Sequence, residues 1–191
     1  MLTPPRNRRD ATELIRDNVA SNHPLSFHKS SELYKKNEIL ATQTNCYAYA
    51  LGSTVPLERH GSLGDLYSKP GIISGRLSHN LSESDNDTFL RRCVEDAEFL
   101  NLPKLVGESS LEILAYTWNC YNPIMEDYTG VGGFHFMRRD SDGMYSHKPG
   151  WEDAPEKINP RLIHHSYEFI GKIVVKNSDI IVSSNLLDNE K

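Results

Sequence analysis

The feature that most restricts the fold is a tight turn between two strand-like segments in residues 132–150, GGFHFMRRDSDGMYSHKPG. Asp, Ser and Gly favour tight turns, and Gly143 suits the left-handed position that follows a type I turn. A loop of residues 141–143 then places Met137 opposite His147. The segment therefore predicts an antiparallel hairpin with a defined register.

The register brings two histidines together. His135 and Met137 share one face of the first strand, because side chains two positions apart point the same way. His147 then lies diagonal to His135, at roughly 7–8 Å between backbones. One imidazole can therefore orient the other through a hydrogen bond. Gly132 and Gly133 indicate a place where another backbone or a ligand approaches closely.

The order of the segments predicts an α+β domain with a mostly antiparallel sheet. Residues 85–100 carry a helical apolar stripe, and Asp85 or Asp87 can cap that helix. Residues 111–121 and 166–184 are rich in strand formers, with two strands expected in the second segment. Helices that precede consecutive strands are typical of the α+β class.

The remaining segments set the expected domain limits. Residues 1–40 predict a helical lead-in, and residues 183–191 predict a frayed polar tail. Between them, residues 41–182 predict a single domain, within which residues 53–84 form a long irregular loop. The sequence predicts no other domain.

Composition excludes several classes of protein. The 191 residues are 38% hydrophobic and 25% charged, with a net charge of −5, which is typical of a soluble globular protein. The negative charge argues against binding to nucleic acid or to a membrane surface. No apolar run approaches the roughly 20 residues of a membrane span, and no secretory signal is recognised. We therefore expect a cytoplasmic protein, or one exported by a leaderless route, without a cofactor.

The three cysteines do not suggest disulfides, because they are odd in number and far apart. Cys93 lies within an apolar helical stripe and is expected to be buried, and Cys120 is expected to fill space near a strand end. Cys46 differs from both. In TQTNCYAYALGS, Thr44 or Asn45 can cap a short helix, which places Cys46 in its first turn. Unpaired amides there favour a thiolate and can donate to an oxyanion.

These segments resemble parts of the papain-like cysteine peptidase superfamily, in its NlpC-type and CHAP-type amidase branches. NCYAYA is similar to the CHAP signature, and HFMRRDSDGMYSH has the NlpC layout of a strand-opening histidine, a turn and a second histidine. The chain also resembles uncharacterised bacterial proteins that carry NCYAYA and HFMRRDSDGMYSHKPG. The resemblance implies that Cys46 is the nucleophile, His135 the general base and His147 the orienting residue.

The implied chemistry is attack of Cys46 on an amide carbonyl, with His135 transferring the proton. The substrate would be a peptide, a protein or a peptidoglycan-like amide, and hydrolysis, deamidation and transfer all remain open. Gln43 and Asn45 are candidate side-chain donors to the oxyanion. We expect the sulfur of Cys46 within about 4–5 Å of a His135 ring nitrogen.

Three alternatives stay open. Asp140 or Asp142 can be proposed as the orienting acid, although both are more typical of the turn itself. A metal site can be built from His135, His147, His164 and His165, with Cys46 as a possible fifth ligand, but the spacing matches no ligand signature. The chain can also be a catalytically inactive binding module, or a leaderless bacterial effector acting on a partner protein, with contacts through WEDAPEK (residues 151–157) and residues 53–84.

Overall fold

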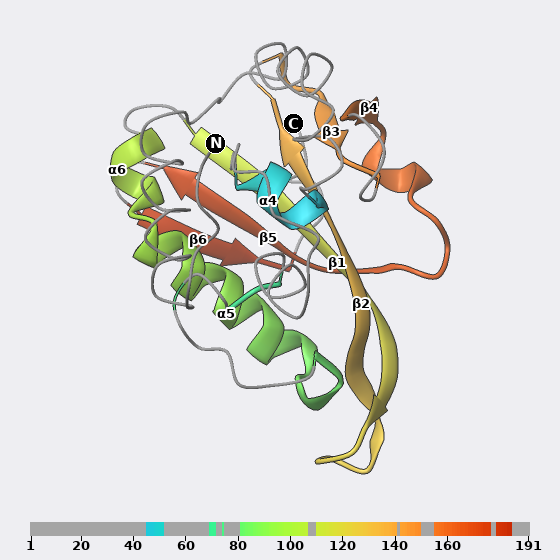
Figure 1. Ribbon diagram of the computed structural model, residues 1–191. Helices are drawn as coiled ribbons and strands as arrows, with labels where there is room; N and C mark the ends of the chain where they lie inside the picture. Colours follow the sequence, from blue (N-terminus) through green and yellow to red (C-terminus); the bar gives the residue numbers. More distant parts are fainter. Residues whose placement is uncertain are drawn as a thin grey trace, which may run out of the picture.

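Six strands form one antiparallel sheet (Figure 1). The computed structural model describes residues 45–51, 69–71, 74, 81–106, 110–140, 142–149, 155–176 and 179–184. The strands are β1 (Ser110–Asn122), β2 (Asp127–Arg139), β3 (Tyr145–His147), β4 (Glu156–Ile158), β5 (Glu168–Lys176) and β6 (Asp179–Ser183). Their order across the sheet is β4-β3-β2-β1-β5-β6, and every neighbouring pair is antiparallel. With the helices, this sheet confirms the α+β prediction.

The helices of the described residues are short apart from one. They are α4 (Cys46–Ala50), η1 (Leu81–Glu83), α5 (Asn86–Phe99), α6 (Leu102–Val106) and η2 (Pro160–Leu162). The cap of α5 is Asp85, whose side chain accepts a 2.7 Å hydrogen bond from the amide of Thr88. Such a cap contributes about 1 kcal/mol. None of the helices within the described ranges has the length and apolar character that a membrane crossing needs.

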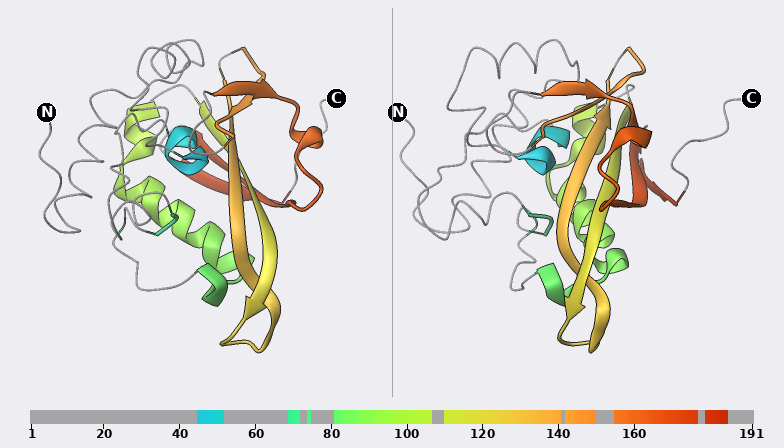
Figure 2. Two further views of the ribbon diagram at one scale, coloured as in Figure 1. Left: turned by 45° about the vertical axis from the view of Figure 1, so that its right-hand side comes forward. Right: turned by 90° about the vertical axis from the view of Figure 1, so that its right-hand side faces the viewer.

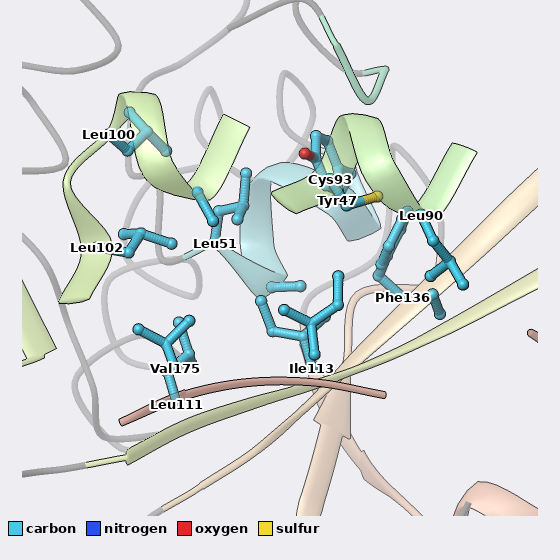
Figure 3. Packing of buried hydrophobic residues seen from close by; sticks show 14 of the residues in the cluster. Tyr47, Leu51, Leu90, Cys93, Leu100, Leu102, Leu111, Ile113, Phe136 and Val175 are labelled. Atoms are coloured by element: carbon cyan, nitrogen blue, oxygen red, sulfur yellow. The ribbon is translucent and has the colours of Figure 1, made fainter. Parts of the chain in front are cut away.

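The main core lies between α4, α5 and α6 and one face of the sheet (Figure 3). Cys93 of α5 is buried there, as predicted. A second, smaller cluster lies on the opposite face. Its buried members are Leu114, Tyr116, Met137 and Tyr145, and the segment that runs from β4 to β5 covers them with Ile163 and Tyr167.

The hairpin between β2 and β3 has the predicted register. Met137 pairs with His147, and Asp140 donates its amide to the carbonyl of Met144 at 2.8 Å. Gly143 has a φ of +80°, the left-handed conformation that glycine adopts without a steric penalty. The turn chemistry therefore sets the pairing of the two histidine-bearing strands.

The structure differs from the prediction at two strands. β2 begins at Asp127, five residues before the predicted start at Gly132, and forms a long hairpin with β1 that extends beyond the other strands (Figures 1 and 2). Residues 156–157, which were expected in an exposed loop, begin β4. The predicted helices before residue 41, most of the predicted loop and residues 185–191 lie outside the described residues.

Candidate active site

Cys46 is the first residue of α4, and the cap is Asn45. The side-chain oxygen of Asn45 accepts a 3.0 Å hydrogen bond from the amide of Ala48. The sequence-based placement of Cys46 in a first helical turn is therefore confirmed. Because the Asn45 oxygen is used in capping, a contribution from Asn45 to an oxyanion would have to come from its amide nitrogen, and that role stays a prediction. Gln43 lies outside the described residues.

Two tyrosines fix α4 in place. The hydroxyl of Tyr47 donates to the carboxylate of Asp96 on α5 at 2.8 Å, and the hydroxyls of Tyr49 and Ser146 are hydrogen-bonded at 2.8 Å. The guanidinium of Arg138 lies 4.5 Å from the centre of the Tyr49 ring. A five-residue helix is marginal by itself, so these contacts to α5, β2 and β3 determine where Cys46 lies.

The Cys46 thiol is buried, with 6% of the residue exposed. Burial raises the pKa of Cys46 to about 12, although hydrogen bonds with the backbone amides of Phe136, Tyr47 and Cys46 itself and the charge of Lys148 lower it. The predicted help from helix-start amides is therefore present, but it is outweighed by desolvation. Burial therefore favours the neutral thiol and opposes the thiolate that the helix start favours.

The two histidines meet in a short contact. Nε2 of His135 lies 2.6 Å from Nδ1 of His147, which confirms that they are within hydrogen-bonding reach. The chain of contacts continues beyond them, since Nε2 of His147 lies 3.2 Å from a carboxylate oxygen of Glu156. Glu156 stands directly opposite His147 in the β3–β4 pairing. Glu156 was not among the predicted site residues, because its segment was expected to form a loop.

This chain of contacts sets the proton positions. The carboxylate of Glu156 accepts, so Nε2 of His147 donates and Nδ1 of His147 is an acceptor. Nε2 of His135 then donates to His147, which leaves Nδ1 of His135 without a proton. Nδ1 is therefore the basic atom of His135.

Burial keeps both histidines neutral. It lowers the pKa of His135 to about 3, with a further lowering from the neighbouring His147. Burial also lowers the pKa of His147, and the hydrogen bond and charge of Glu156 oppose this change. A neutral imidazole can accept a proton, so His135 is in the form that a general base requires.

The Cys46 thiol reaches the backbone of β2 at the residue that follows His135. β3 pairs with β2 only over Met137–Arg139, so the hydrogen bond between the Cys46 thiol and the amide of Phe136 lies just past the end of β3. Phe136 directly follows His135. The rings of His135 and Tyr167 contact each other, with centroids 5.8 Å apart, and the pKa of Tyr167 is raised by burial and by the charge of Cys46. Tyr167 therefore contacts the His135 ring and lies within range of the charge of Cys46. The predicted approach of the Cys46 sulfur to a His135 ring nitrogen stays a prediction.

The two turn aspartates have other partners. Asp140 is buried and pairs with Arg138 at 3.1 Å and with Lys157 at 2.7 Å. Asp142 pairs with Lys157 at 3.0 Å. Arg138 in turn contacts the Tyr49 ring of α4, on the face of the sheet opposite to His135. Neither aspartate contacts the histidine pair through these bonds.

Other expected ligands and space-filling residues are placed differently. Among the described residues, no three His, Cys, Asp or Glu side chains are grouped so as to hold a metal ion. His164 and His165 pack against each other on the surface, with ring centroids 4.1 Å apart. Cys120 is partly exposed and does not belong to the core. The metal alternative gains no support.

The close approach predicted at the two glycines is made by a side chain. Trp118 of β1 lies across Gly132 and Gly133 of β2, and a Cβ atom on either glycine would overlap its indole ring. The group that approaches the two glycines is thus the Trp118 side chain, and not a backbone segment or a ligand. Only glycine leaves room for the ring at these two positions.

Comparisons of the chain with protein-family models, with curated proteins and with solved structures returned no match. We therefore infer the function from the residues and geometry of the site.

Proposed function

We propose that this protein is a cysteine-nucleophile amide hydrolase of the papain-like type, with Cys46 as nucleophile, His135 as general base and His147 as the residue that orients His135. The observation that supports it best is the hydrogen-bonded chain from Glu156 through His147 to His135, which leaves Nδ1 of His135 unprotonated. The papain-like order of parts, a helix-start cysteine followed by a strand with the histidine, also supports the proposal.

The reaction starts from a neutral pair. As the sulfur of Cys46 attacks the amide carbon, the thiol proton moves to Nδ1 of His135. The resulting imidazolium shares its charge with His147 and Glu156. His135 then protonates the leaving nitrogen, the C–N bond breaks, and a thioester remains on Cys46. A water molecule that gives its proton to His135 attacks the thioester, and the acid is released with the thiol restored.

Because the Cys46 thiol and the His135 imidazole are both neutral at rest, His135 has a larger role than it would have in a preformed thiolate–imidazolium pair. With the pKa of Cys46 raised by burial and that of His135 lowered, charge separation is unfavourable until substrate is bound. Proton transfer and attack must then occur together, as for a serine nucleophile. The orientation of His135 by His147 and Glu156 consequently affects the rate of acylation.

The test is covalent capture of the nucleophile. A peptidyl vinyl ester imitates the amide and forms a stable thioether, so intact-mass and peptide mass spectrometry identify the residue that reacts. We expect one adduct, on Cys46, in the wild-type protein and in Cys120→Ala, and none in Cys46→Ala. Adduct formation on Cys120 alone would contradict the proposal.

A further inference from the structure

An aromatic surface leads away from the histidine pair on the same face of the sheet. The Tyr167 ring contacts His135 at 5.8 Å between centroids, and the Trp118 ring contacts Tyr167 edge-on at 5.0 Å. Trp118 and His135 share this face, because Trp118 pairs with Gly133 while Tyr116 pairs with His135. We call Trp118 and Tyr167 together the aromatic shelf.

The shelf is held rigidly and is open to solvent. The indole of Trp118 packs on Gly132 and Gly133, where no side chain separates it from the strand backbone. Even so, 39% of Trp118 remains exposed. An exposed indole held in one orientation binds with little loss of conformational entropy, which is the property of a preformed subsite.

The surroundings of the shelf favour an apolar ligand. Tyr167 packs against the apolar cluster of Leu114, Tyr116, Met137 and Tyr145, beside Ile163 and Phe169. A side chain placed on the shelf would extend this cluster and remove apolar surface from water. A sugar ring would instead require several polar partners around an aromatic platform.

We propose that the aromatic shelf binds a large apolar side chain of a peptide substrate, next to the amide that Cys46 attacks. This proposal rests on the proposed function and narrows its substrate class to peptides or proteins. Trp118 supplies the outer wall of the subsite, and Tyr167 connects it to His135. The shelf thereby selects which amide reaches the nucleophile.

The experiment uses three vinyl ester probes that differ only in the group beside the electrophile: Phe, Gly, or an N-acetylglucosaminyl group. The labelling rate of Cys46 is measured by intact-mass spectrometry. We expect wild-type protein to react about tenfold or more faster with the Phe probe than with the Gly probe, within the range of pocket discrimination. Trp118→Ala should lower this ratio about tenfold, and Trp118→Phe should preserve most of it.

A matched control is available on the same hairpin. Tyr128 is 74% exposed and its ring contacts Tyr121, so Tyr128→Ala should keep the wild-type ratio. Equal labelling of Cys46 by the Phe and Gly probes would overturn the shelf and leave the catalytic proposal standing. Fastest labelling by the sugar probe would also overturn the apolar assignment. No labelling of Cys46 by any probe would overturn both proposals.

Discussion

Nε2 of His135 and Nδ1 of His147 face each other across 2.6 Å, and the second nitrogen of His147 faces Glu156. The direction of these bonds follows from the carboxylate at the end of the chain, because a carboxylate only accepts. Under our proposal, His147 therefore orients the His135 ring and selects its tautomer, which is the role of an acid or amide in cysteine hydrolases. Each link can be tested separately.

Glu156→Gln should lower the rate at which Cys46 is acylated by about tenfold. The amide can donate as well as accept, so it no longer selects the tautomer of His147, and partners of this kind are worth about 10–100-fold in metal sites. We expect a loss of rate at the low end of this range, because the Glu156 side chain is 63% exposed. Glu98→Gln, on the exposed side of α5, is the control and should react like wild type. An unchanged rate in Glu156→Gln would show that His147 does not need the carboxylate.

The ¹⁵N spectrum of His135 should show a neutral ring, protonated at Nε2, at pH 7 and still neutral at pH 5. Burial lowers its pKa from 6.5 to about 3, so it does not take up a proton where an ordinary histidine does. Heteronuclear NMR of ¹⁵N-labelled protein measures this directly. An imidazolium signal at pH 7 would mean that a thiolate–imidazolium pair already exists.

The lowered pKa of His135 also makes the free energy of unfolding depend on pH. The unfolded chain binds a proton at His135 below about pH 6.5, whereas the folded chain does not until about pH 3. The contribution of His135 to stability is therefore fully present above pH 6.5 and declines as the pH falls towards 3. Urea unfolding of wild type and His135→Gln between pH 7 and 4 should show the steeper loss in wild type. Parallel curves would argue against a buried neutral His135.

Asp140→Ala should lower the free energy of unfolding by about 3–5 kcal/mol, because it leaves the buried guanidinium of Arg138 without this carboxylate. Asp142→Ala removes the exposed carboxylate that shares Lys157 and should change stability little. Urea unfolding measures both. If Asp140→Ala stayed as stable as wild type but lost acylation of Cys46, Asp140 would be the orienting acid.

Iodoacetamide should modify Cys120 before Cys46 and Cys93 in the folded protein at neutral pH. Cys120 is partly exposed, while the other two are buried with raised pKa values. The expectation is opposite to the one that the helix-start position of Cys46 suggests by itself. Peptide mass spectrometry after short exposures gives the order. Faster modification of Cys46 would reveal a thiolate in the resting protein.

Local sequence signals predicted the parts of the site that local structure positions. Asn45 before Cys46 predicts the helix start, and Gly143 in the turn predicts the register that joins His135 to His147. Glu156 could not be found in this way, because β4 has three residues, EKI, and too little alternation to indicate a strand. Its pairing with β3 places the carboxylate.

Tertiary packing explains the predictions that were wrong. The thiol of Cys46 is surrounded by residues distant in sequence, so its burial and raised pKa do not follow from its place in a helix. Gly132 and Gly133 correctly indicated a close approach, but the group that approaches is Trp118, from the neighbouring strand. A residue's place in its own segment could be predicted, and its surroundings could not.

The acylation rate of Cys46 in two histidine variants tests the central claim most directly. His135→Ala should lose about 10²–10⁴-fold, because the base takes part in proton transfer. His147→Ala should keep measurable acylation, because it loses only the selection of a tautomer and a ring orientation. Circular dichroism confirms that each variant is folded before rates are compared. His135→Ala should be the slower variant by a wide margin, and wild-type acylation of Cys46 in His135→Ala would contradict the proposed role of His135 as the base.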